Sequence, residues 1–153
     1  DERLSMKYFA YGSNMDATRM KKRGVRFSSR VPAVLEGHVL RFNKTATRNP
    51  KEGYANIVEA RKERVEGCLY DIPDPDISKL DGYEKYPQHY DRKTLPVRLN
   101  DGSTVQAVVY VAQPDKVRAG LKPAKEYLDH LLLGKDILSS AYYKKLAYTE
   151  TLD

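Results

Sequence analysis

Gly12, Ser13 and Asn14 follow an aromatic segment near the start of the chain. A glycine at the end of a strand lets the backbone turn sharply and exposes successive N–H groups. Ser13 and Asn14 add side-chain hydrogen-bond donors, and a helix capped by Asp16 would begin beside them. Exposed amides at a helix start favour an anionic group such as a carboxylate, so we predict a ligand-binding loop here. From local spacing alone, an ordinary turn is the competing interpretation.

Glu84 is the candidate for proton transfer. On a helix expected from Pro75 to about Lys85, Ile77, Leu80 and Glu84 fall on the same side. A carboxylate that faces the core is costly unless it is paired or protonated. Desolvation raises its pKa, which suits a general acid or base near neutral pH. The competing interpretation is a glutamate in a fraying last turn that reaches solvent or pairs with a neighbouring cation.

Four further residues are secondary candidates. Asp81 is a rival carboxylate on the same helix, but it lies off the apolar side. Tyr90 can donate a hydrogen bond to a ligand carboxylate or to Glu84. Arg92 can pair with an acid, although a surface position explains it equally well. Tyr127 lies on the apolar stripe of its own helix, so its default place is in the core.

The remaining sequence predicts the elements that position these residues. Alternating or aromatic segments indicate strands at 7–11, 39–42, 55–58, 63–70, 95–99 and 105–111. Helices are expected at about 16–22, 75–85 and 123–133, with a last one capped by Ser139. The polar segment 43–53 indicates a mobile loop. Strands outnumber helices and several are joined by tight turns, so we predict an α+β fold with a mainly antiparallel, barrel-like β-sheet flanked by a few helices.

The chain has 153 residues, which suits one domain, and we place it at residues 6–148. Residues 1–5 precede Met6, and we interpret them as an N-terminal extension or an expression remnant. Charge is uneven, because residues 1–64 hold 15 Lys/Arg and 7 Asp/Glu, whereas the remainder holds 12 and 14. The basic half predicts either a nucleic-acid surface or a solvated face that attracts small anions. No recognised nucleic-acid motif accompanies the charge, so we favour the second interpretation.

Several chemistries are poorly supported by the residues present. No apolar run approaches the length of a membrane span. A single cysteine, Cys68, excludes an intrachain disulfide framework, and we therefore expect a cytoplasmic protein. His38, His89 and His130 are scattered without a cysteine or carboxylate at ligand spacing, so we expect no metal site.

Five motifs in register resemble those of the γ-glutamylcyclotransferase family. The matching segments are residues 8–15, 53–57, 65–70, 80–84 together with 90–92, and 122–134. They follow the family's order and extend the resemblance over nearly the whole chain, from Met6 to about Leu146. One departure stands out, because members usually have Gly after the catalytic glutamate and this chain has Lys85.

The resemblance implies an enzyme that releases 5-oxoproline and a free amine from a γ-glutamyl amino acid or amine, as in glutathione metabolism. The α-amine of the glutamyl group attacks its own γ-carbonyl, and no metal or organic cofactor is required. The family's catalytic glutamate corresponds to Glu84, which would act as general acid/base. The residues expected to bind substrate, from the resemblance and from the position of Tyr90, are Tyr8, Phe9, Ala10, Tyr11, Gly12, Ser13, Asn14, Tyr90 and Tyr127.

Two alternatives from other functional classes stay open. One is a non-catalytic module of the same fold that binds a small ligand; it is favoured if Lys85 stabilises ionised Glu84 and lowers its pKa. The other is a basic nucleic-acid-binding protein. The expected partner is a small γ-glutamyl molecule, and the expected assembly is a monomer or a homodimer.

Overall fold

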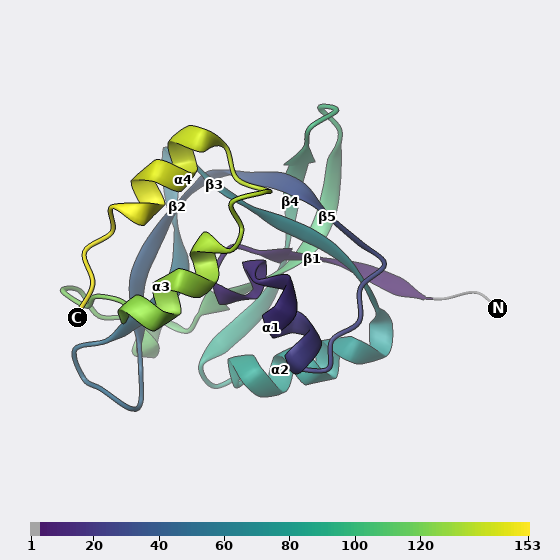
Figure 1. Cartoon of the computed structure of the whole chain (residues 1–153). Helices are drawn as coiled ribbons and strands as arrows, with labels where there is room; N and C mark the ends of the chain where they lie inside the picture. The colour runs from purple at the N-terminus through teal and green to yellow at the C-terminus, as the bar shows by residue number, and fades with distance from the viewer. Residues whose placement is uncertain (1–3) are drawn as a thin grey trace.

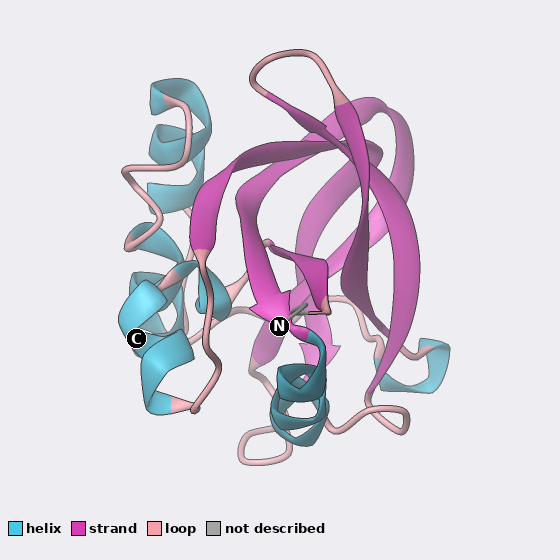
Figure 2. Ribbon diagram, turned by 90° about the vertical axis from the view of Figure 1, so that its right-hand side faces the viewer, coloured by secondary structure: helices cyan, strands magenta, loops and turns pink. Residues whose placement is uncertain are grey.

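Five strands close into a barrel in the computed structural model, which describes residues 4–153. Around the barrel they run in the order β1-β3-β2-β4-β5. Four neighbouring pairs are antiparallel, and β1 and β5 pair in parallel. Figure 2 shows the strands curving around a common axis, which confirms the predicted barrel-like sheet. The strands are β1 (Ser5–Ala10), β2 (Ser29–Thr45), β3 (Gly53–Pro73), β4 (Tyr90–Leu99) and β5 (Thr104–Ala112).

The helices lie outside the strands (Figures 1 and 2). As predicted, Asp16 caps the first one, because its Oδ1 accepts hydrogen bonds from the N–H groups of Thr18 and Arg19. No helix within residues 4–153 is both long and apolar enough to cross a membrane. The helices are α1 (Ala17–Lys22), α2 (Ile77–Glu84), α3 (Lys125–Leu132) and α4 (Ser140–Ala147), and the short 3-10 turns are η1 (Ser13–Met15), η2 (Asp74–Asp76) and η3 (Pro114–Lys116).

Strands β2 and β3 are much longer than the sequence indicated. They pair from Ser29 opposite Asp71 to Thr45 opposite Gly53, so the predicted segments 55–58 and 63–70 belong to a single strand. The predicted loop is shorter than expected, because β2 continues through Thr45. Residues 61–64, halfway along β3, are exposed and charged on both faces, which removes the alternation that marks a strand.

The sheet begins before Met6. Ser5 lies opposite Pro73 in the pairing of β1 with β3. The carbonyl of Leu4 accepts a hydrogen bond from the N–H of Asp74 at 3.0 Å. The last two residues of the segment that we set apart as an extension therefore contact the sheet, while residues 1–3 lie outside the described part of the chain.

Apolar side chains form an inner and an outer core. Neighbouring residues of a strand point to opposite faces, so β1 contributes Phe9 to the inner core and Tyr8 to the outer one. The outer core joins the barrel to the helices. Buried members of the inner core include Phe9, Leu35, Ile57, Val65, Leu69, Val97 and Val109. Buried members of the outer core include Tyr8, Met20, Tyr70, Leu80, Leu128, Leu131 and Leu146.

Helix α2 ends at Glu84 because the next residue, Lys85, adopts a left-handed conformation with φ 53° and ψ 47°. The N–H of Lys85 points back to the carbonyls of Asp81 and Gly82, which closes the helix. Glycine takes this conformation without steric cost, whereas other residues are strained in it. The backbone thus explains why a glycine suits the position after Glu84.

Replacing Gly67 with alanine should destabilise the barrel, since a Cβ there would lie 2.4 Å from the carbonyl oxygen of Ala10. Overpacking of this kind costs about 1–3 kcal/mol. Urea unfolding of Gly67→Ala should therefore show a lower free energy of unfolding. The matched control is Gly82→Ala inside α2, where the new Cβ meets nothing within 4 Å and helix propensity should add up to about 1 kcal/mol. Equal effects of the two changes would contradict this packing argument.

Replacing Lys85 with glycine should raise the free energy of unfolding by about 1 kcal/mol, because it relieves the left-handed strain. Lys85→Ala removes the same side chain but keeps the Cβ, so it should give no comparable gain. Lys85→Val should destabilise, because branching at Cβ worsens the strain. Thermal and urea unfolding measure the stability of all three variants. A lower free energy of unfolding in Lys85→Gly would show that the backbone of Lys85 is not strained.

Candidate functional site

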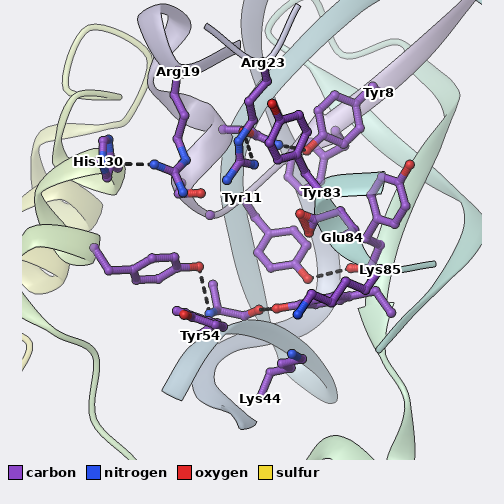
Figure 3. A pocket seen from close by; sticks show the side chains of 18 of the residues that line it. Tyr8, Tyr11, Arg19, Arg23, Lys44, Tyr54, Tyr83, Glu84, Lys85 and His130 are labelled. Carbon is purple, nitrogen blue, oxygen red and sulfur yellow. Dashed lines mark hydrogen bonds between the residues drawn. The ribbon is translucent and has the colours of Figure 1, made fainter. Parts of the chain in front are cut away.

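A cavity of about 240 Å³ lies where β1 leaves the barrel, and α1, α2 and α3 contribute to its walls. Figure 3 shows it from close by. Of Glu84 and the residues expected to bind substrate, all but Ala10 line it, whereas the secondary candidates Asp81 and Arg92 do not. Ala10 is buried in the outer core. The lining residues that were anticipated are Tyr8, Phe9, Tyr11, Gly12, Ser13, Asn14, Glu84, Tyr90 and Tyr127.

The turn at Gly12 is packed tightly against its neighbours. A Cβ added to Gly12 would lie 3.1 Å from the Cβ of Ala55 and 3.4 Å from the hydroxyl of Tyr127. The small residue therefore lets the end of β1 approach both β3 and α3. Directly after it, Ser13 begins the 3-10 turn η1, and both residues face the cavity.

Asn14 is buried and held on three sides. Its Nδ2 donates to the Tyr8 hydroxyl at 3.0 Å, and its Oδ1 accepts from Nη1 of Arg23 at 3.0 Å. The Tyr70 hydroxyl donates to the Asn14 carbonyl at 2.6 Å. This loop is therefore a fixed part of the cavity wall, unlike an ordinary surface turn.

The hydroxyls of three cavity tyrosines form hydrogen bonds with backbone groups. Tyr127 accepts a hydrogen bond from the Ala55 N–H at 3.0 Å, and Tyr90 donates to the Ala55 carbonyl at 2.7 Å. Tyr11 donates to the Tyr110 carbonyl. Burial raises the pKa of Tyr11, Tyr90 and Tyr127 above the usual value, so all three stay neutral. In this structure Tyr90 thus donates to the backbone of β3 and not to Glu84.

Glu84, the last residue of α2, turns its carboxylate into the cavity (Figure 3). Within residues 4–153 no group hydrogen-bonds that carboxylate. Burial raises the pKa of Glu84, while the positive charges of Arg23, Lys44 and Arg19 act in the opposite direction. The upward direction prevails, so the presence of Lys85 next in the chain does not leave Glu84 with a lowered pKa.

Asp81 and Arg92 are engaged with one another. Nη1 of Arg92 lies 3.2 Å from Oδ2 of Asp81, and the Tyr110 hydroxyl donates to Oδ1 at 2.7 Å. Arg92 also lies over the ring of Tyr86. The rival carboxylate is thus neutralised by its own partners, and Glu84 is left as the unpartnered one.

Arg19 and Arg23 enter the cavity from one face of α1, four residues apart. Arg23 lies over the ring of Tyr83, 4.5 Å from its centroid. Nη1 of Arg19 lies 3.1 Å from Nε2 of His130. The Nε–H of Arg19 is buried and has no partner in the described part of the chain. From the sequence we predicted no role at this site for either arginine and considered Arg23 only as part of a possible nucleic-acid surface, although the i, i+4 spacing after the predicted cap at Asp16 places both on one face.

His130 links α3 to the start of α1. Its Nδ1 lies 2.8 Å from Oδ2 of Asp16. Because Arg19 can only donate, Nε2 of His130 accepts and its Nδ1–H donates to Asp16. The ring is therefore neutral in this arrangement, and it holds the Arg19 guanidinium at the cavity.

Lys44 approaches from β2, on the other side of Glu84 from the arginines (Figure 3). Its side chain is buried, and Nζ lies 2.7 Å from Nδ1 of His89. The ammonium group also lies over the rings of Tyr54 and Tyr90, 5.6 Å and 5.5 Å from their centroids. Burial, followed by the charge of Lys85, lowers the pKa of Lys44 to about 8. The sequence offered no sign of this role, because Lys44 falls in the segment interpreted as a loop.

The arrangement provides one desolvated carboxylate with positive charges on two sides. Such a site can take a proton from a bound amine and can hold an anionic ligand. In the described chain, residues 4–153, no group of three or more His, Cys, Asp or Glu side chains is placed to hold a metal ion.

Solved structures share this fold. A structure described as "Gamma-glutamyl cyclotransferase" superimposes with a TM-score of 0.86 at 23% identity, covering 98% of this chain and 90% of that one. An uncharacterized Homo sapiens protein, loc79017, gives a TM-score of 0.86 at 24% identity over 97% of this chain and 90% of that one. At these identities the likeness establishes the fold.

Sequence comparison extends the likeness to a family. A Drosophila melanogaster protein named "Putative gamma-glutamylcyclotransferase CG2811" is 35% identical over 57 residues, which is 36% of this chain and 36% of that protein. The match thus spans about a third of the length of this curated relative. A family model described as "Gamma-glutamyl cyclotransferase, AIG2-like" matches residues 8–129, most of the chain. The chain therefore belongs to the AIG2-like gamma-glutamyl cyclotransferase family.

Proposed function

We propose that this protein converts a γ-glutamyl amino acid or amine into 5-oxoproline and a free amine. The observation that carries the proposal is the Glu84 carboxylate, which faces a cavity that is also lined by the loop of Gly12, Ser13 and Asn14. The α-amine of a γ-glutamyl group is normally protonated and cannot attack a carbonyl. A desolvated carboxylate with a raised pKa is suited to remove that proton.

One residue can carry the protons that this reaction moves. Glu84 takes a proton from the α-ammonium group, and the freed nitrogen attacks the γ-carbonyl carbon. When the bond to the departing nitrogen breaks, protonated Glu84 gives the proton to that nitrogen. The ring nitrogen then loses its second proton to the regenerated Glu84 carboxylate, which passes it to the released amine or to solvent, and the neutral ring amide of 5-oxoproline results. Five-membered ring closure is intramolecular, so most of the enzyme's task is to hold the substrate in the reactive conformation.

The loop after β1 supplies that positioning. Amides and side chains of Gly12 and Ser13 can receive the substrate's α-carboxylate or the developing oxyanion. Asn14 is fixed by Tyr8 and Arg23, so the loop is organised before a ligand arrives. Arg19 and Arg23 add positive charge on the same side, which favours an anionic substrate.

The two alternatives make different use of the same residues. A module that binds without turnover would need no raised pKa at Glu84. A nucleic-acid surface would need exposed free cations, yet several basic residues of the N-terminal half are paired with carboxylates. These pairs are Arg26 with Asp76, Arg30 with Asp136 and Arg48 with Glu52. Both observations favour the enzyme.

Glu84→Gln should reduce 5-oxoproline release from a panel of γ-glutamyl dipeptides by about 10²–10⁴-fold, since it removes the acid/base group and keeps its size. Asp81→Asn is the matched control and should retain turnover, because Asp81 is engaged with Tyr110 and Arg92. Full activity of Glu84→Gln would refute the assigned role. If the wild-type protein binds these dipeptides but releases no 5-oxoproline, the binding module is the better description.

The acid limb of the pH profile of kcat/KM should lie above the ordinary glutamate pKa. The carboxylate is the active form, and burial raises the pKa of Glu84, so activity is lost as the pH falls through a value higher than usual. Arg23 opposes that rise, so Arg23→Gln should move the limb to still higher pH. Arg41→Gln, at an exposed position of β2, should leave the limb in place. A limb that moves down in Arg23→Gln would contradict this electrostatic account.

A further inference from the structure

The cavity that holds Glu84 carries more positive than negative charge. Its acidic lining residues are Glu84 and the exposed Glu126. Arg48 at its edge is already paired with Glu52 at 2.8 Å. The other cations in the lining are Arg19, Arg23, Lys44 and Lys85. A ligand that fits this cavity must therefore bring negative charge.

Among these cations, Lys44 has the greatest need of a negatively charged partner. Its side chain is only 4% exposed, and within residues 4–153 no carboxylate oxygen lies within 4.0 Å of Nζ. Burying an unpaired charge is costly. Its hydrogen-bond partner His89 has a lowered pKa and is a neutral acceptor, so it satisfies one N–H without balancing the charge. With a pKa of about 8, Lys44 remains mostly protonated at neutral pH.

The position of Lys44 indicates which part of a substrate would meet it. Asn14 of the substrate loop contacts Arg23, so the loop and the arginines belong to the same side of the cavity. Figure 3 places Lys44 and Tyr54 on the opposite side, with Glu84 between the two groups. A glutamyl group held at the loop would have its γ-carbonyl near Glu84. The departing portion would then extend toward Lys44.

We propose that Lys44 binds a carboxylate of the leaving group and so determines substrate preference. The preferred substrates are γ-glutamyl compounds whose released amine carries a carboxylate next to the scissile amide, as an α-amino acid does. The rings of Tyr54 and Tyr90 flank the ammonium group and orient it. An uncharged leaving amine would leave Lys44 buried and unpaired. This inference rests on the proposed cyclotransferase reaction and adds a specificity residue to it.

The test compares γ-glutamyl-alanine with γ-glutamyl-alaninamide, which have nearly the same shape and differ in the charge of the leaving group. For the wild-type protein, kcat/KM for 5-oxoproline release should be about 10–100-fold higher with the acid, as expected for a hydrogen bond to a charged group, chiefly through KM. Lys44→Met and Lys44→Gln should bring this ratio close to one. Lys44→Arg keeps the cation and should retain part of the preference.

The matched control is Lys93→Met, which removes the same charge from an exposed position of β4 and should keep the wild-type ratio. Turnover of the amide by the Lys44 variants reports that they are folded. The inference is overturned if the wild-type protein treats both compounds alike, or if Lys44→Met and Lys44→Gln keep the preference; in both cases the cyclotransferase reaction still stands. If the wild-type protein releases 5-oxoproline from no γ-glutamyl compound, the proposed function fails first and the inference with it.

Discussion

The backbone of Ala55 joins three walls of the cavity. Its N–H donates to Tyr127 of α3, and its carbonyl accepts from Tyr90 of β4. Gly12, at the end of β1, approaches its Cβ so closely that a side chain there would be crowded. Strand β3 pairs with β2 on either side of Ala55, through Tyr54 and Asn56. This one peptide position therefore links the loop at Gly12 to helix α3.

The electrostatics of the site rest on two opposing effects. Removal of water raises the pKa of Glu84, and the surrounding cations lower it. The Glu84 carboxylate has no hydrogen-bond partner within the described chain. The nearby Asp81, in contrast, is paired with Arg92. Lys44 lines the same cavity as a buried positive charge, and within residues 4–153 its hydrogen-bond partner is His89 and no carboxylate. In the reaction we propose, these two groups would link the acid/base chemistry to the recognition of an anionic substrate.

The sequence predicted short or strongly patterned elements better than long polar ones. The loop at Gly12 follows an aromatic strand, and the stripe that contains Leu128 and Leu131 indicates its helix. The β2–β3 hairpin was predicted as separate short segments, because residues 61–64 in the middle of β3 are exposed on both faces. Such a strand is stabilised by hydrogen bonds to the backbone of its partner strand. Those bonds do not depend on side-chain type, so the hydrophobic pattern of the sequence does not reveal them.

By itself, the sequence determined the kind of fold, the turn at Gly12 and the inward side of Glu84, since glycine placement and helical spacing act over a few residues. The loop that it led us to first proved to be a fixed wall held by Tyr8, Tyr70 and Arg23. Only the tertiary structure decided which charges surround Glu84. Arg19 and Lys44 come from separate elements, and their burial depends on contacts between residues that are far apart in the chain. Desolvation and charge pairing are properties of that shared space, so no local pattern encodes them.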